Sequence, residues 1–335
     1  MPLPIADTTY VLPIRRTRLV QPDDLGAYLE SLARLLPVVV VDGSPPEVVA
    51  HHRATWPRSI QHLSVDEDRR IDLNGKVAGT VTGLRRVRTP KAVIADDDVR
   101  HDAFTLRRMS VLLDRADVVR PQNVFVPAPW HALVDGGRTL IARATGGDWP
   151  GTLGVRMDRY RRADGYDGDV LFENLELVRT LCAAGGREHV ALDLFVPRRP
   201  PTVRHFLSQR VRQAYDEHAR PGRLAAQLAI APLLLTATIR FGPRAPLAFA
   251  AAATALAELG RRRNGGALAF SPLTSLCAPA WALERAVTSW CALVLRRRGG
   301  VRYSHGRLRR AANSEAVIRA QLAQRRPQPR AEDAT

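Results

Sequence analysis

The sequence predicts an α/β fold in which helices flank a mostly parallel sheet, followed by a C-terminal helical region. Three observations support this. Short apolar, β-branched runs alternate with segments of helical spacing over the first 130 residues. Two of these runs end in acidic side chains, and the last third of the chain is both apolar and basic. We therefore expect an α/β domain over 1–215, a helical region over 216–315 and a disordered tail over 316–335.

The individual elements follow from periodicity. Leucines at 25, 29, 32 and 35/36 have helical spacing, and the small-residue segment 74–87 also reads as a helix. The predicted strands are 10–15, the valine run that opens 38–46 and leads to a proline stop, 59–66, 91–98 and, later, 189–197, with a helix over 173–186 that Gly185 and Gly186 end. In a parallel sheet, ligands bind beyond the carboxyl ends of the strands. The strand pattern therefore places a binding site near Asp42 and near the triplet Asp96–Asp98.

The middle of the chain, roughly 118–200, is rich in Gly, Pro and Trp, which favours loops over a groove. Trp130, His131 and Trp149 could form a platform for a sugar or a lipid acceptor, or they could anchor the core and the loops.

The charge distribution indicates a membrane surface as a partner. Residues 1–200 hold 28 basic and 26 acidic residues, whereas residues 201–335 hold 22 and 7. This basic excess lies beside uncharged runs of 16 residues (224–239) and 13 residues (245–257), each shorter than the roughly 20 apolar residues of a membrane span. Basic residues beside apolar helices favour contact with an anionic membrane, with packing in a soluble helical subdomain as the alternative.

Other classes of site and partner find little support. Three cysteines without CxxC spacing predict reduced thiols in a cytosolic setting. His51 and His52 read as a surface feature of a helix, and the histidines show no metal-ligand spacing. Nucleic acid is not expected, because basic patches interleaved with aromatic residues and a helix-turn-helix pattern are both missing.

The order of motifs resembles the inverting family 2 glycosyltransferases with the GT-A fold, especially the membrane-associated branch that includes ceramide glucosyltransferase. The matching segments, over about residues 10–215, are VVVVDGS, NGKVAG, IADDDV, LFENLEL and QRVRQ. The resemblance implies a Rossmann-like, mostly parallel sheet. It also implies transfer of a sugar from a nucleotide-diphosphate donor to a hydroxyl of a lipid or envelope glycan at the cytoplasmic face of the membrane.

The resemblance also implies roles for the acidic and basic residues at the strand ends. Asp42 would contact the base or ribose, since a carboxylate accepts from N–H and hydroxyl donors. Asp96 and Asp98 form an Asp-x-Asp pair, with Asp96 near the nucleotide and both acids available to Mg²⁺ or Mn²⁺, which take carboxylates plus substrate phosphates. Lys76 would lie near the nucleotide, with a solvated helix lysine as the alternative.

The general base is the uncertain part of the predicted site. An inverting transfer needs a carboxylate that takes the proton of the acceptor hydroxyl. The family has a Glu-Asp pair here, with the Asp usually the base, but this chain has Glu173 followed by Asn174. Because an amide cannot take that role, Glu173 or Asp169 must substitute, and we slightly favour Glu173.

The last motif of the family, Gln-x-x-Arg-Trp, is matched by Gln209 and Arg212, with Gln213 in place of the tryptophan. A guanidinium suits a diphosphate, so Arg212 could stabilise the leaving group.

Two other functions stay open. A nucleotidyltransferase would carry a glycine-rich loop after the first strand, and IRRTRLVQ has no glycine; a catalytically inactive membrane-bound scaffold would account for Asn174 and Gln213.

Overall fold

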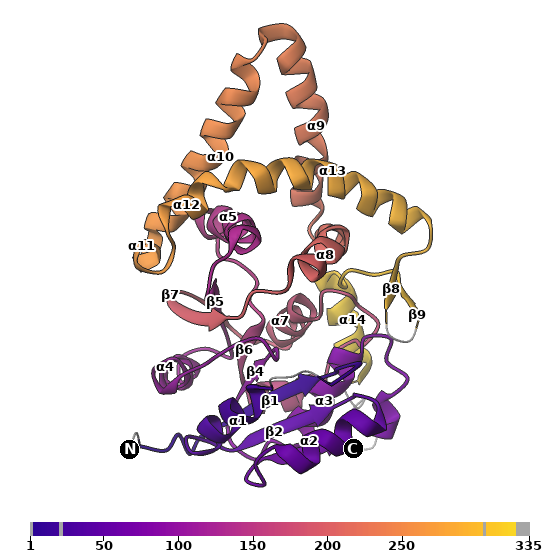
Figure 1. Ribbon diagram of the computed structural model, residues 1–335. Helices are drawn as coiled ribbons and strands as arrows, with labels where there is room; N and C mark the ends of the chain where they lie inside the picture. Colours follow the sequence, from indigo (N-terminus) through magenta and orange to yellow (C-terminus); the bar gives the residue numbers. More distant parts are fainter. Residues whose placement is uncertain (1–2, 20–22, 304–305, 326–335) are drawn as a thin grey trace, which may run out of the picture.

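The centre of the protein is a seven-stranded sheet with the order β3-β2-β1-β4-β6-β5-β7 (Figure 1). The structure is a computed structural model that describes residues 3–19, 23–303 and 306–325. Neighbouring strands are parallel, except that β6 runs antiparallel to β4 and β5. The strands are β1 (Thr8–Ile14), β2 (Val38–Asp42), β3 (Gln61–Ser64), β4 (Lys91–Ala95), β5 (Val118–Phe125), β6 (Thr152–Arg156) and β7 (Glu188–Arg198). The predicted mostly parallel α/β sheet is confirmed, and it is consistent with a GT-A fold.

Helices cover both faces of the sheet, which explains why the strands read as unbroken apolar runs. Side chains alternate along β4, so Val93 and Ala95 join the core under α1 and α4, while Ala92 and Ile94 join the core under α3, α6 and α7. The covering helices are α1 (Leu25–Ala33), α3 (Gly75–Arg86), α4 (Ala103–Leu113), α6 (Met157–Ala163) and α7 (Glu173–Ala183).

Glycines let α3 approach β1 closely. A Cβ on Gly79 would lie 2.9 Å from Cβ of Pro13, and one on Gly83 would lie 2.5 Å from Cγ1 of Val11. Any larger residue would push the helix off the sheet. The helix begins at Gly75, where the Asn74 side chain accepts from the backbone N–H of Lys76. This packing places Lys76 beside the carboxyl ends of the central strands.

The C-terminal part is helical, as predicted, and a helical hairpin projects from it (Figure 1). The hairpin consists of α9 (Pro221–Phe241) and α10 (Arg244–Arg262). Its base packs on α5 (Trp130–Thr145) and α13 (Ala278–Arg297), and α13 also packs on α8 (Val203–Tyr215). The remaining elements are α2 (Pro46–Thr55), α11 (Gly266–Ala269), α12 (Pro272–Leu276), β8 (Val301–Tyr303), β9 (Gly306–Leu308) and α14 (Glu315–Arg325).

Two predictions about regular structure were wrong. The tail expected to be disordered from residue 316 begins as α14, which packs on α7 and buries Ile318; residues 326–335 lie outside the described residues. In the middle segment the predicted helix 173–186 and strand 189–197 are present as α7 and β7, but the Gly-, Pro- and Trp-rich part that was expected to form loops contains α5, α6, β5 and β6. Its glycines instead allow close packing, as at Gly137, where a Cβ would lie 2.8 Å from the backbone of Ala278.

Candidate functional site

A cavity of about 1000 Å³ opens at the carboxyl ends of β1, β2 and β4. It collects seven of the eight side chains that the sequence predicts for the site: Asp42, Lys76, Asp96, Asp98, Glu173, Gln209 and Arg212. These residues come from β2, α3, the loop after β4, α7 and α8. The structure therefore brings the lone acid after β2 and the triplet after β4 to one cavity.

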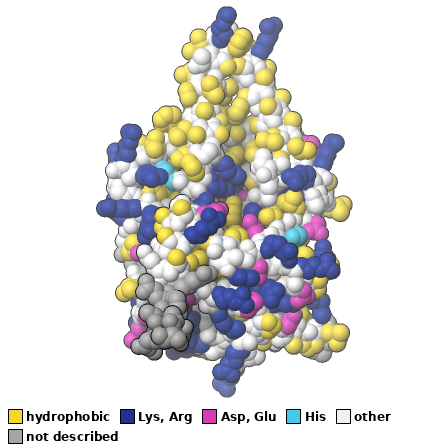
Figure 2. Space-filling view, turned by 180° about the vertical axis from the view of Figure 1, so that it is seen from behind, with side chains coloured by type: hydrophobic (Ala, Val, Ile, Leu, Met, Phe, Trp, Pro, Cys, Tyr) yellow, Lys and Arg dark blue, Asp and Glu magenta, His cyan; other side chains and the backbone are white. Residues whose placement is uncertain are grey.

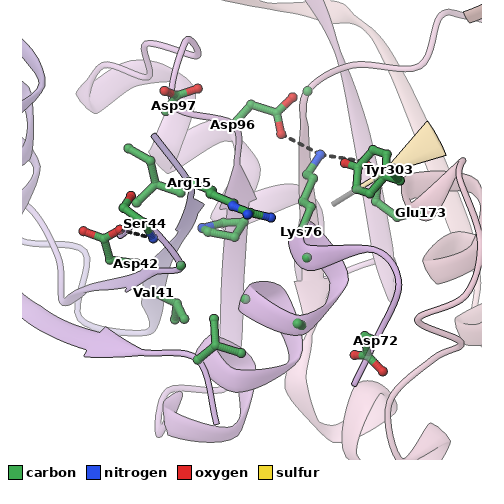
Figure 3. Close-up of a pocket in the computed structure, with 18 of the residues that line it drawn as sticks. Arg15, Val41, Asp42, Ser44, Asp72, Lys76, Asp96, Asp97, Glu173 and Tyr303 are labelled. Carbon is green, nitrogen blue, oxygen red and sulfur yellow. Dashed lines mark hydrogen bonds and ion pairs between the residues drawn. The ribbon is translucent and has the colours of Figure 1, made fainter. Parts of the chain in front are cut away.

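The Lys76 amine lies between two acidic side chains that line the cavity (Figure 3). Its Nζ lies 2.5 Å from Oδ1 of Asp96 and 2.6 Å from Oε1 of Glu173. Burial would lower the pKa of Lys76, but the two carboxylates raise it well above its usual range, so the ammonium stays charged. Lys76 thus places a fixed positive charge beside the Asp-x-Asp pair.

Arg198, at the end of β7, supplies a second cation to the same pair. Its Nε lies 2.9 Å from both carboxylate oxygens of Asp98, and its Nη2 lies 3.3 Å from Oδ2 of Asp96. Burial would raise the pKa of Asp96, but the charges of Lys76 and Arg198 hold it below its usual value. The acidic cluster that looks unpaired in the sequence is therefore neutralised by cations from α3 and β7.

The Asp-x-Asp pair matches a hard divalent cation in ligand type. Asp96 and Asp98 line the same cavity with carboxylate oxygens, which Mg²⁺ and Mn²⁺ prefer. Within the described residues no group of three or more His, Cys, Asp or Glu side chains could hold a metal. The pair could therefore provide only part of a coordination shell, and Arg198 competes for the oxygens of Asp98. Substrate phosphates would have to complete such a site.

Asp42 lies at the cavity, but its carboxylate is fully buried. Oδ2 accepts from Nδ1 of His52 at 2.7 Å and from Nε2 of His62 at 3.1 Å, while Oδ1 accepts from the backbone N–H of Ser44 at 3.0 Å. Burial would raise the pKa of Asp42, but the hydrogen bonds from His62, His52 and Ser44 hold it far below its usual value. The interpretation of His52 as a surface residue was wrong, because His52 is 1% exposed and stacks on Trp56.

The structure separates the two predicted bases. Glu173 begins α7 and lines the cavity, whereas Asp169 does not line it. Oδ1 of Asp169 instead accepts from the backbone N–H of Leu73 at 3.1 Å, so this acid fastens the loop before α3. The structure therefore does not bring Asp169, the predicted alternative base, to the cavity. Asn174 also lines the cavity, and its Nδ2 donates to the carbonyl of Pro150.

The motif on α8 forms another wall of the cavity. Nη1 of Arg212 donates to Oε1 of Gln209 at 2.9 Å, and its guanidinium lies 4.9 Å from the ring centroid of Tyr303. Burial would lower the pKa of Arg212, but Tyr303 and Asp216 raise it above its usual value. Arg212 is therefore a third fixed cation beside the cavity.

Of the aromatic residues considered for a sugar platform, only Trp149 lines the cavity. It packs edge-on against Phe172 and under the guanidinium of Arg120. Trp130 is exposed on α5, and His131 is buried, with its ring hydrogen-bonded to the carbonyl of Pro201. Sequence reasoning missed Arg198, Tyr303 and Asp216 in this cavity, and no local motif marks any of the three.

No protein-family model matches the chain, and no curated protein matches it. Solved structures similar to it include the mannosyltransferase PcManGT from Pyrobaculum calidifontis in complex with GDP-Man and Mn²⁺. That match has 22% sequence identity and a TM-score of 0.48 over 85% of this chain and 87% of the other. These values are too low to assign a fold or an activity. The geometry of the cavity is therefore the basis of the functional argument.

Proposed function

We propose that this chain is an inverting glycosyltransferase of the family 2 type. It would transfer a sugar from a nucleotide-diphosphate donor to a hydroxyl of a lipid or envelope glycan at the cytoplasmic face of the membrane. The observation that carries the proposal is the single cavity in which the Asp-x-Asp pair meets Lys76, Arg198 and Arg212.

The cations of the cavity suit a diphosphate. Arg198 and Arg212 offer planar guanidinium groups that bind phosphate oxygens with two hydrogen bonds, while Lys76 acts as a point charge. All three carry their charge at neutral pH, since their carboxylate and tyrosine neighbours raise the pKa of each. They would stabilise the negative charge that grows on the leaving diphosphate as the glycosidic bond of the donor breaks.

The nucleoside would lie over the end of β2, between α2 and α3, where Asp42, Gly43 and Ser44 line the cavity. Asp42 would act there mainly by holding the Ser44 turn, because its own oxygens are occupied. Mg²⁺ or Mn²⁺ belongs to the proposal as well. Asp98 and Asp96 would hold the ion together with the donor phosphates, and its charge would add to that of the three cations.

The hairpin of α9 and α10 would bring the cavity to the membrane. Its large exposed hydrophobic side chains are Leu233, Leu235, Ile239, Phe241, Leu247, Leu256 and Leu259. Arg240 and Arg244 lie beside the turn, and Figure 2 shows basic side chains at the tip above a largely hydrophobic shaft. Among the described helices α9 alone is long and apolar enough to cross a membrane. At about 1.5 Å per residue its 21 residues would extend about 31 Å, close to the roughly 30 Å hydrocarbon core.

A thermal-shift screen tests the donor site. The chain would be heated with UDP-, GDP- and dTDP-sugars, each with and without Mg²⁺ or Mn²⁺. A nucleotide at 100 times its Kd stabilises the folded state by about 2.7 kcal/mol. We expect at least one nucleotide sugar to raise Tm in the presence of metal, and less so in Asp98→Asn. If none of them does so, the proposed function is wrong.

A further inference from the structure

A second cavity, of about 200 Å³, shares a wall with the donor cavity. It lies between α5, α7, α8 and the base of α9, and its far side is lined by Arg220, Arg223 and Arg285. The shared wall includes side chains from β7, α8 and the turn after α8. Because Arg220 and Arg223 stand where the projecting hairpin begins, this cavity connects the donor site with the hairpin.

The shared wall contains two carboxylates, Asp98 and Asp216. Both oxygens of Asp98 accept from Nε of Arg198, and the proposed function assigns Asp98 to the metal ion and the donor phosphates. Asp216 follows directly after α8, and its Oδ1 is buried without a hydrogen-bond partner. Asp216 is therefore the carboxylate at the junction of the two cavities that keeps an oxygen available, within the part of the chain that the structure describes.

The two acids that the sequence predicts as the base, Glu173 and Asp169, make other contacts. Oε1 of Glu173 lies 2.6 Å from Nζ of Lys76, and that ion pair also orients Asp96. The next residue on α7 is Asn174, an amide, and Asp169 is outside both cavities. A base placed at the junction would reach an acceptor that enters from the side of the hairpin.

We propose that Asp216 is the general base of the transfer and that the second cavity receives the acceptor hydroxyl. This inference rests on the proposed function. In the step, Asp216 takes the proton of the acceptor hydroxyl while the oxygen forms a bond to the anomeric carbon of the donor sugar. The bond from that carbon to the diphosphate breaks, and the nucleoside diphosphate leaves with the electron pair.

The surroundings of Asp216 suit a base that works near neutral pH. Burial raises its pKa to about 7, with Arg212 on α8 and Arg220 opposing the shift and Glu173 on α7 and Glu217 adding to it. Below this pH the carboxyl is protonated and cannot accept a proton. The rate should therefore rise as the pH increases through about 7.

The test is release of nucleoside diphosphate from UDP-glucose, GDP-mannose and dTDP-glucose. The full chain is assayed with Mn²⁺ on phosphatidylglycerol vesicles containing diacylglycerol, so that water and a lipid hydroxyl are both available as acceptors. We expect Asp216→Asn to lower kcat by about 10²- to 10⁴-fold and to abolish the rise of rate with pH, while nucleotide binding is kept. Glu173→Gln should keep that rise, and Asp193→Asn, at a surface ion pair on β7, should match the wild type.

The outcomes distinguish a failure of Asp216 as the base from a failure of the proposed function. If the wild type turns over a donor and Asp216→Asn keeps both the rate and the pH dependence, Asp216 is not the base. If the wild type releases no diphosphate from any donor, the proposed function falls, and the base with it. Should Asp216→Asn fail to fold, Asp216→Glu decides. A folded Asp216→Glu with a lower rate or a shifted midpoint of the pH dependence supports the proposal, and one with the wild-type rate and midpoint overturns it.

Discussion

Replacing Lys76 by methionine is expected to cost stability and nucleotide binding together. The Nζ of Lys76 pairs with both Asp96 and Glu173. Methionine has a similar length and no charge, so the two carboxylates would face each other without their shared cation. Asp96 would keep Arg198 at 3.3 Å, whereas Glu173 would lose its 2.6 Å contact.

The size of the stability effect follows from burial. The side chains of Lys76, Asp96 and Glu173 are 21%, 22% and 12% exposed. Breaking a fully buried pair costs about 3–5 kcal/mol, and an exposed pair is worth about 1 kcal/mol or less, so we expect a loss of about 2 kcal/mol. At about 2.1 cal/mol/K per residue, 335 residues have an unfolding entropy of about 0.7 kcal/mol/K. The melting temperature should fall by about 3 °C.

Lys91 provides a matched control, because the chain has only these two lysines. Its Nζ also bridges two acids, at 2.6 Å from Asp7 and from Asp114, but it lies outside the donor cavity. Both of those acids are more than 40% exposed, so Lys91→Met should cost about 1 kcal/mol or less. It removes the same charge and should leave nucleotide binding unchanged.

Two measurements decide the outcome. Urea unfolding gives the loss of stability, and titration with UDP, GDP and dTDP gives the change in Kd. In the double variant Lys76→Met, Glu173→Gln the unpaired carboxylate is gone, so part of the lost stability should return. Lys76 is not part of the nucleotide site if Lys76→Met binds the nucleotide as tightly as Lys91→Met. Glu173 is not the carboxylate left unpaired if the double variant is less stable than Lys76→Met alone.

Three further outcomes are expected. Asp42→Asn should lower the free energy of unfolding by about 2 kcal/mol at pH 7, as measured by urea unfolding. Because folding lowers the pKa of Asp42, the difference in stability from the wild type should shrink as the pH falls below about 4. An equal loss at pH 7 and at pH 3.5 would contradict this role of Asp42. The double variant Leu235→Glu, Ile239→Glu should no longer sediment with phosphatidylglycerol vesicles, because placing each charge in a bilayer costs about 2.5–3.5 kcal/mol. The control Val111→Glu, at an exposed position on α4, should have no effect. Unchanged sedimentation of the double variant would show that the hairpin does not bind the membrane. Asp98→Asn should remove the Mn²⁺-dependent part of nucleotide stabilisation and keep the metal-independent part, and a full metal effect in this variant would assign the ion elsewhere.

The strands and helices of the sheet domain could be predicted because their signals are local. Four consecutive valines before Asp42 mark a buried strand without knowledge of any neighbour. The edge at which Asp42 and Asp96 meet was also predictable, since parallel strands present their carboxyl ends on one side. The helix α14, which runs into the expected tail, was not predictable, because its formation depends on packing against α7.

The type of fold, the edge of the sheet that carries the site and most of the side chains there follow from periodicity and residue type, which can be read along the chain. Which charges meet depends on how the chain folds. Arg198 is 100 positions from Asp98, and Lys76 is 97 positions from Glu173, so no spacing rule links them. Packing also brings His52 and His62 into hydrogen-bond contact with Asp42 and leaves Asp169 bonded to the loop before α3. It places Asp216 at the junction of the two cavities. Burial and the distances between side chains set their protonation and their freedom to react, and both arise only once the chain is folded.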